Sequence, residues 1–270
     1  MALPRSDGNS TVGLRKTSIQ ELQAILVQLG VETGDVVMMH SAVFTLGIVE
    51  DGLAGVYQAF RNVLGRDGTL IVPTFTYSFR RGEIFDVRNT PCPKVLGAFS
   101  EHVRGAEGAV RSADPLFSMA AIGPEAEELM RRPSNRCFGH GSVYETLFAR
   151  NMLILAIGIT YDTGISAFMH LERLANVEYR RDLLLDGTTV GPDGAAYVDS
   201  AVHFERNVEK FPGGRRDRIP FGLEMERHGV SNAIDYGSGR HVAIRAKPFE
   251  AFTLERLSRD PWAMFNRNVG

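Results

Sequence analysis

The chain has 270 residues, of which 44% are hydrophobic and 23% charged, and its formal net charge is −2. These values are typical of a globular protein with a substantial core, and a near-neutral charge gives no support for binding to nucleic acid or to an anionic membrane. No apolar segment approaches the roughly 20 residues that span a bilayer, and the polar N-terminus lacks the apolar core of a signal peptide. We therefore expect a cytoplasmic protein without nucleic-acid or membrane partners.

The two cysteines, Cys92 and Cys137, are far apart in the chain and do not form a CxxC or CxxH spacing. This pattern argues against a disulfide framework and against structural zinc. We expect no metal site.

The N-terminal half begins with residues 1–18, which we expect to form a flexible arm rich in small polar residues. Ser18 with Glu21 is typical of a capping box, so a helix is predicted to start there and to end at Gly30. A short apolar strand over 36–39 then leads to His40 and Ser41. A helix over 51–64 and a strand over 69–72 follow, and this alternation predicts a βαβ unit in a largely parallel sheet.

The middle of the chain, residues 75–111, mixes turn residues with aromatic ones and predicts loops with one helix over 98–104. A long irregular stretch inside a compact protein usually has a functional reason. A strand over 117–122 and a helix over 124–131 come next.

The C-terminal third changes character after Tyr179. Asp186-Gly187 and Pro192-Asp193-Gly194 are turn signals, so antiparallel hairpins are expected. We also predict a helix over 202–210, a strand over 242–246 and a last helix over 251–259. The whole of 19–270 is expected to form one domain, with a β-rich subdomain within 180–245.

The segment that carries most chemical information follows the apolar run 152–157. This run predicts a buried strand, and it ends at Gly158, after which a polar turn opens a helix with His170 and Glu172. In open α/β sheets, ligands bind beyond the carboxyl ends of the strands. A histidine at such a place can accept a proton near neutral pH.

An ordered set of short motifs resembles the aminoglycoside 3-N-acetyltransferase family, also called antibiotic N-acetyltransferases, from about residue 22 to residue 180. No single motif is specific, but their order over some 150 residues is. The motifs are Leu29-Gly30-Val31, Gly34-Asp35, His40-Ser41, Leu46-Gly47, Gly65, Gly68-Thr69-Leu70, Pro73-Thr74, Phe85-Asp86, Thr90-Pro91, Arg111-Ser112-Ala113-Asp114-Pro115, Ser118, Gly123, Phe138-Gly139-His140-Gly141-Ser142 and the segment 158–170.

The resemblance implies an α/β fold in three α/β/α layers, with a mostly parallel sheet and a smaller β-rich addition in the C-terminal third. It also implies an enzyme that moves an acetyl group directly from acetyl-CoA to an amine of an aminoglycoside or related amino sugar. Its partners would be CoA and a small-molecule amine acceptor, and a homodimer is left open. No metal and no covalent acyl-enzyme are implied.

The resemblance and the chemistry of the residues together assign roles. His170 is the predicted general base and Glu172 the carboxylate that orients it. Backbone N–H groups of the turn that holds Gly141, or those near His40, are expected to stabilise the thioester oxygen. The set predicted to contact the cofactor is His40, Ser41, Arg111, Ser112, Ser118, Gly141 and Ser142, and the set predicted to contact the acceptor is Thr76, Asp86 and Glu205.

One departure from the family concerns the carboxylate. The family pattern is His-x-x-Glu, whereas here Glu172 follows His170 after one residue, which points the two side chains away from each other on a helix of about 100° per residue. Either a helix distortion restores the pair, or another acid such as Asp162 or Glu205 orients the base.

Two alternatives to an aminoglycoside-modifying enzyme are kept. A polycationic acceptor needs an acidic cleft, and the acidic residues show no visible cluster, so a biosynthetic N-acyltransferase acting on an amino sugar or a nucleotide-linked amine is one of them. If the acceptor is phosphorylated, the basic run 210–218 becomes relevant to its binding. The other is a non-catalytic CoA-binding homologue, which the displaced Glu172 favours and the presence of His170 disfavours.

Overall fold

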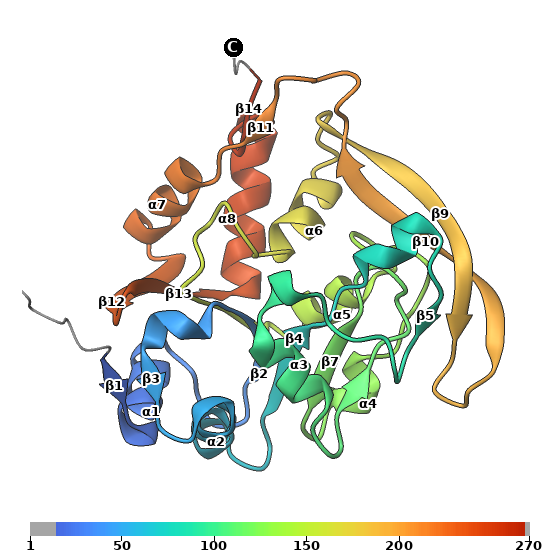
Figure 1. Cartoon of the computed structure of the whole chain (residues 1–270). Coiled ribbons are helices and arrows are strands. Elements are labelled where there is room, and N and C mark those ends of the chain that lie inside the picture. Colours follow the sequence, from blue (N-terminus) through green and yellow to red (C-terminus); the bar gives the residue numbers. More distant parts are fainter. Residues whose placement is uncertain (1–14, 268–270) are drawn as a thin grey trace, which may run out of the picture.

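A computed structural model describes residues 15–267 of the chain. Its centre is a seven-stranded mixed sheet, in which β2 pairs in parallel with both β4 and β8 while the flanking pairs are antiparallel. The expected parallel arrangement therefore holds for the three central strands only (Figure 1). In spatial order the strands are β12 (Ser231–Tyr236), β13 (Gly239–Arg245), β8 (Leu153–Ile157), β2 (Val36–Ser41), β4 (Thr69–Pro73), β7 (Met119–Ile122) and β6 (Val110–Arg111).

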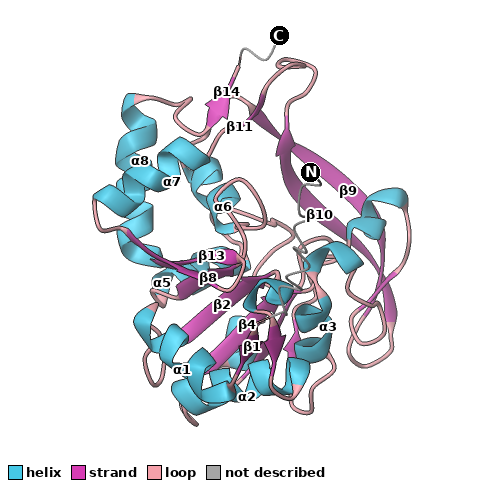
Figure 2. Ribbon diagram, turned by 60° about the vertical axis from the view of Figure 1, so that its left-hand side comes forward, coloured by secondary structure: helices cyan, strands magenta, loops and turns pink. Residues whose placement is uncertain are grey.

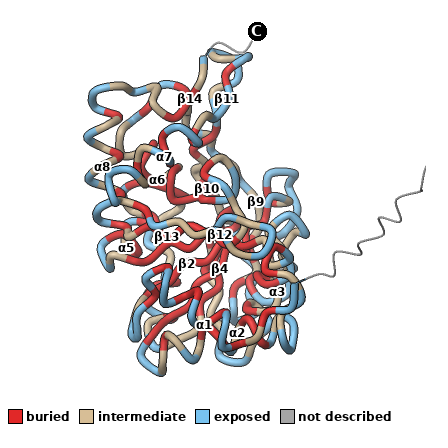
Figure 3. The backbone as a smooth tube through the Cα atoms, turned by 90° about the vertical axis from the view of Figure 1, so that its left-hand side faces the viewer, coloured by how far each residue is buried: buried red, intermediate tan, exposed pale blue. Residues whose placement is uncertain are grey.

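The central strands are buried on both faces, as their uninterrupted apolar sequences predict. Alternate residues of these strands belong to two separate hydrophobic clusters, one on each face of the sheet. Met38 and Ile154 belong to the first cluster, and Val37 and Leu155 to the second. Figure 3 shows this buried centre. The first cluster packs on α4 (Ala126–Leu129), α5 (Val143–Ala149), α6 (Ala167–Leu174), α7 (Ile219–Arg227) and α8 (Ala246–Arg259), and the second on α1 (Ile19–Gln28), α2 (Gly52–Leu64) and α3 (Ala98–Arg104).

The start of α1 confirms the predicted capping box, because the Ser18 hydroxyl accepts the Glu21 N–H while the Glu21 carboxylate accepts the Ser18 N–H. Most of the predicted arm, residues 1–14, lies outside the described residues. Its last part is not free: β1 (Lys16–Thr17) pairs with β3 (Ile48–Val49), and Thr17 is buried.

The region after α6 forms a long hairpin, β9 (Arg180–Val190) and β10 (Ala196–Arg206), whose outer edge pairs with β5 (Phe85–Asp86). This hairpin stands apart from the central sheet in Figure 2. A small two-stranded pair, β11 (Arg215–Arg216) and β14 (Phe265–Asn266), lies near the C-terminal end of the described chain.

Two local predictions in this region were wrong. The predicted helix over 202–210 is instead the end of β10, up to Arg206, followed by a turn, because an eleven-residue ladder with β9 outweighs helix propensity there. Asp186-Gly187 is not a turn but lies inside β9, and the hairpin turns at 191–195. Gly187 has a packing role, since a Cβ there would stand 2.5 Å from the Phe79 ring.

This close packing yields a test of the hairpin. Gly187→Ala should lower the free energy of unfolding by about 1–3 kcal/mol, because the new methyl group meets the buried Phe79 ring. Urea unfolding of Gly105→Ala is the matched control, since a Cβ at Gly105 has its nearest neighbour at 3.4 Å. Equal stabilities of the two variants would contradict the register of β9.

Candidate active site

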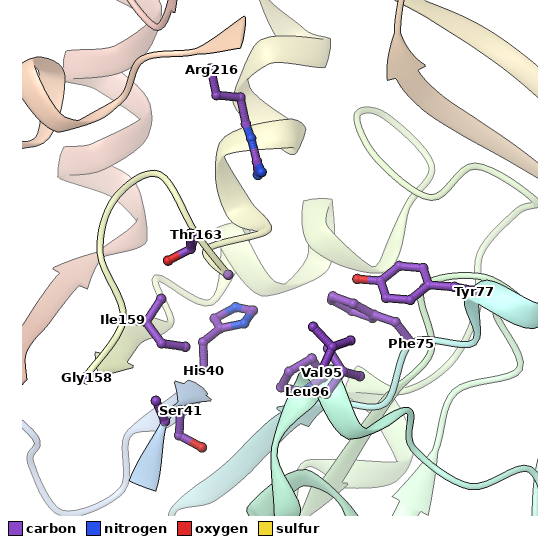
Figure 4. Close-up of a pocket in the computed structure, with 13 residues that line it drawn as sticks. His40, Ser41, Phe75, Tyr77, Val95, Leu96, Gly158, Ile159, Thr163 and Arg216 are labelled. Carbon is purple, nitrogen blue, oxygen red and sulfur yellow. The ribbon is translucent and has the colours of Figure 1, made fainter. Parts of the chain in front are cut away.

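A cavity of about 470 Å³ lies beyond the carboxyl ends of β2, β4 and β8. We call it the strand-end cavity, and its position follows the general rule for open α/β sheets. Figure 4 shows His40 at its floor, Phe75 and Tyr77 on one side, Ile159 and Thr163 on the other side, and Arg216 above His40. Its described lining residues are His40, Ser41, Ala42, Pro73, Phe75, Tyr77, Val95, Leu96, Gly158, Ile159, Thr163, Gly164 and Arg216.

His40 is the imidazole that lines this cavity, as its place at the end of a strand predicts. The side chain is only 2% exposed, and its Nε2 lies 3.3 Å from the Ser166 Oγ. The Ser166 hydroxyl in turn hydrogen bonds to the phenol of Tyr144. Burial lowers the pKa of His40 to about 4, so the ring is neutral at pH 7 and available to accept a proton.

The turn at Gly158 shapes the wall beside His40. Gly158 has a φ of 65°, and a Cβ there would come within 2.1 Å of the Thr45 Oγ1. Its N–H donates to Nδ1 of His241, whose Nε2 lies 2.9 Å from the carbonyl of Tyr236. A buried histidine therefore fixes the strand-to-loop turn that carries the cavity wall.

His170 lies elsewhere, between α5, α6 and α8. Its ring is 1% exposed, its Nδ1 accepts the N–H of Gly139 at 3.1 Å, and the ring of Phe148 packs on it at 4.6 Å. Burial lowers its pKa to about 4. It lines a separate cavity of about 200 Å³, which we call the helix cavity, with His140, Glu145, Phe148, Ala149, Leu174, Lys247 and Glu250.

Glu172 does not contact His170. Its carboxylate is fully buried and accepts hydrogen bonds from Arg180 at 2.5 Å and Arg218 at 2.7 Å, with the phenol of Tyr179 at 3.3 Å. Burial acts to raise the pKa of Glu172, but the two guanidinium groups outweigh it and hold the pKa below its usual value. The carboxylate is thus committed to an ion-pair network.

The structure shows neither of the two arrangements that could give His170 a carboxylate partner, a distorted helix or another acid. Helix α6 is continuous over 167–174, so no distortion brings Glu172 to His170. Asp162 accepts the backbone N–H of Arg218, and Glu205 accepts from Arg80 and Arg181, so neither orients the ring. The carboxylate whose charge acts on His170 is Glu145. A catalytic role for His170 or Glu172 stays a prediction.

Counting back from Glu172 gives a different correspondence with the His-x-x-Glu pattern. Three residues earlier stands Met169, not a histidine, and the two share a helix face because they are about 60° apart. With this register no deletion is needed. Counted in this way, the spacing places Met169 at the histidine position of the pattern, while the assignment of His170 stays a prediction.

The predicted cofactor residues Arg111, Ser112 and Ser118 do not line the strand-end cavity. The Arg111 guanidinium donates to the carbonyls of Thr74 and Thr90 and to the hydroxyls of Thr74 and Ser118. Ser112 accepts the N–H of Met119 through its hydroxyl. Arg111 thereby joins the 87–90 loop to the end of β4. Its N–H donors are hydrogen bonded to protein atoms, which gives no support to the predicted contact with a CoA phosphate.

The remaining predicted residues are also separated from one another. Gly141 donates its N–H to Glu145, and the Ser142 hydroxyl donates to the carbonyl of Gly139, so this turn lies beside the helix cavity. Asp86 accepts the N–H groups of the turn that follows it. Thr76 stands between two cavity-lining aromatic residues, but its buried Oγ1 has no partner.

Of all the predicted site residues, only His40 and Ser41 line the strand-end cavity. No signal in the sequence indicated Tyr77 there, and Arg216 was linked to the acceptor only as part of the basic run 210–218. Both come from segments without regular periodicity, and no local pattern indicates that loops over 130 residues apart meet. Within residues 15–267, no group of three or more His, Cys, Asp or Glu side chains could hold a metal ion, and no helix is long and apolar enough to cross a membrane.

Comparisons with known proteins agree with the motif order. A sequence profile described as aminoglycoside 3-N-acetyltransferase matches residues 38–258. The aminoglycoside N(3)-acetyltransferase VII of Streptomyces paromomycinus is 31% identical over 265 residues, covering 86% of this chain and 88% of the relative. The type IV enzyme of a Salmonella species is 29% identical, covering 89% of this chain and 87% of the relative.

Solved structures share the mixed α/β fold around the central sheet. The AAC-IIIb structure, a binary complex with CoASH, has a TM-score of 0.78 at 22% identity and covers 91% of this chain and 97% of its own. A histidine-to-alanine mutant of AAC(3)-IVa, in complex with a gentamicin, has a TM-score of 0.77 at 25% identity and covers 93% and 92%.

The buried imidazoles predict how stability depends on pH. In the unfolded chain a histidine titrates near 6.5, whereas the folded pKa of His40 and of His170 is about 4. Between these values the unfolded chain binds protons that the folded chain does not, so the free energy of unfolding falls as the pH drops.

His170→Gln should remove one such group while keeping an acceptor for the Gly139 N–H. Urea unfolding from pH 6.5 to pH 4 should then show a slope shallower by up to about 1.4 kcal/mol per pH unit. The exposed His228→Gln is the control for the loss of an imidazole that is not buried. A wild-type slope in His170→Gln would show that His170 is not buried in its neutral form.

Proposed function

Because the chain belongs to the aminoglycoside 3-N-acetyltransferase family, we propose that it transfers an acetyl group from acetyl-CoA to an amine of an aminoglycoside or related amino sugar in the strand-end cavity. The observation that carries the proposal is a neutral imidazole, His40, on a cavity at the carboxyl ends of three parallel strands. A solved relative that holds CoASH supports acetyl-CoA as the co-substrate.

The cavity has the composition that such a reaction needs. Its volume of about 470 Å³ is within the range of small-molecule sites, and Phe75, Leu96 and Ile159 provide an apolar wall. Ser41, Thr163 and Tyr77 bring hydroxyl groups to it, which are suited to the hydroxyls of a sugar. A dry apolar wall with a few polar groups is the usual form of a substrate site.

The chemistry is direct transfer. The neutral amine attacks the thioester carbonyl carbon, the new C–N bond forms, the C–S bond breaks, and the CoA thiolate leaves. The attacking nitrogen becomes strongly acidic as it bonds to carbon, and its proton passes to the imidazole and then to the thiolate or solvent. A ring whose pKa is about 4 can accept that proton, although it is too weak a base to deprotonate a free ammonium group efficiently.

We assign the proton acceptor to His40 rather than to the predicted His170. His170 does not line the strand-end cavity and has no contact with Glu172. His40 lines the cavity, and the hydroxyl of Ser166 holds its Nε2. The Ser166–Tyr144 chain orients the ring in place of a carboxylate.

A second candidate function is a CoA-binding protein that does not transfer acetyl groups. Its support is the α6 face that carries Glu172, on which Met169 takes the place of the histidine in the His-x-x-Glu pattern. A thioether cannot accept a proton from an amine. In this case acetyl-CoA would bind without releasing free thiol in the presence of any amine.

Paired glutamine variants separate these assignments. His40→Gln should keep acetyl-CoA binding and lose about 10²- to 10⁴-fold in turnover, the usual effect of a positioned general base. His170→Gln, measured in the same thiol-release assay over a panel of amino sugars, should stay within a few-fold of wild type.

Calorimetric titration with acetyl-CoA and thermal unfolding of both variants control for loss of the fold. The reverse order of activities would restore His170 as the base. Absence of thiol release in the wild type, with acetyl-CoA bound, would favour the non-transferring candidate.

A further inference from the structure

Arg216 belongs to the basic run 210–218 and is the charged residue of that run that lines the strand-end cavity. It lies on β11, and Figure 4 shows its guanidinium directed into the strand-end cavity toward His40. Among residues 15–267 its side chain makes no hydrogen bond and no ion pair within 4 Å. The neighbouring Arg218, in contrast, is bound to Glu172.

The surroundings of Arg216 leave its positive charge uncompensated. Although the residue as a whole is exposed, its pKa is lowered, first by burial and then by the nearby Arg218 and Arg180. Glu172 and Asp162 act in the opposite direction, but Glu172 is shared by two arginines and Asp162 accepts the Arg218 N–H. A partly desolvated guanidinium without a partner is a strong binding group for an anion.

The described wall of the cavity has no negatively charged side chain that could bind a cationic acceptor. None of the described lining residues is an aspartate or a glutamate. Glu205, the acid predicted to contact the acceptor, is bound by Arg80 and Arg181 instead. A polycationic amine that entered this cavity would lose hydration without gaining a carboxylate and would be repelled by Arg216.

The anion recognised by Arg216 belongs to the acceptor rather than to CoA. In acetyl-CoA an extended pantetheine arm holds the pyrophosphate about 15 Å from the thioester by covalent reach. Arg216 lines the same cavity of about 470 Å³ as His40, the proposed proton acceptor. An anionic group on a small amine can reach it there without leaving His40.

Building on the proposed function, we infer that the acceptor of this protein is an amine that also carries an anionic group, such as a phosphorylated amino sugar, and that Arg216 is the residue that selects it. The guanidinium holds the anion at one side of the strand-end cavity, which leaves the amine free to face His40. The substrate class is then opposite in charge to gentamicin-type aminoglycosides.

Glucosamine 6-phosphate and glucosamine are a matched probe pair, since they differ only in the phosphate. In calorimetric titrations of the wild type with CoA present, the phosphorylated amine should bind at least ten-fold more tightly, as expected for a charge-assisted bidentate contact. Arg216→Gln should abolish that preference. Arg215→Gln is the control, because Arg215 precedes it on the same exposed strand without lining the cavity.

Reversing the charge at position 216 gives an independent test of the same inference. Arg216→Glu should weaken glucosamine 6-phosphate binding further and strengthen gentamicin binding, while acetyl-CoA affinity stays at the wild-type value in all variants. Equal binding of the two amines by the wild type, or an equal loss in Arg215→Gln, would overturn the inference. So would an Arg216→Gln variant that weakens acetyl-CoA binding but keeps the preference for phosphate.

The titrations need no turnover, so they separate this inference from the proposed function. If the wild type prefers the phosphorylated amine but releases no thiol from acetyl-CoA, the proposed transfer fails and the selectivity of Arg216 stands. If thiol release is rapid with glucosamine and unchanged by its phosphate or by Arg216→Gln, the transfer stands and the selectivity fails.

Discussion

A buried carboxylate without compensation would be very costly, and Glu172 avoids this through two arginines. Arg180 comes from the start of the β9–β10 hairpin, and Arg218 from the turn before α7. The ion pairs therefore tie α6 to both segments. They also fix the rotation of α6, which places Glu172 on one side of the helix and His170 on the other. The loop that carries Arg216 ends at Arg218, so the same network holds a wall of the strand-end cavity.

This rotation divides the histidines into two environments. His170 is turned toward Phe148 and the helix cavity, while Ser166 at the start of the same helix faces His40. Both rings are kept neutral by burial, but only His40 shares a cavity with hydroxyl groups and an uncompensated cation. The proposed chemistry of the site thus depends on helix rotation as much as on residue type.

The fold was predictable where local signals are strong. The capping box at Ser18, helix α3 and the strand that ends at His40 follow directly from hydrophobic period and cap residues. The antiparallel β9–β10 hairpin and its turn at Pro192-Asp193-Gly194 were predicted, but the eleven-residue length of its ladder was not, because Gly187 reads as a turn signal although it is required by contact with Phe79. Contacts between segments far apart in the chain, such as that of Gly187 with Phe79, are not indicated by any periodic pattern in the sequence.

The same limit applies to the site. His40 lies at the cavity because a strand end defines its position, whereas Arg111, whose contact with the cofactor stays a prediction, donates to the carbonyls of Thr74 and Thr90. Arg216 and Tyr77 are 139 residues apart in the sequence, so only the tertiary structure brings them together at the cavity. The offset of Glu172 from His170 was visible in the sequence, and its consequence became clear once α6 proved to be regular.

The central claim is that the reacting groups meet at His40. Side-chain NMR of the imidazoles tests it most directly, with each ring signal assigned from its glutamine variant. On addition of CoA, the ring signals of His40 should shift, and those of His170, which lies on the separate helix cavity, should keep their positions. Shifts at His170 with none at His40 would contradict the account and place the ligand between α5, α6 and α8.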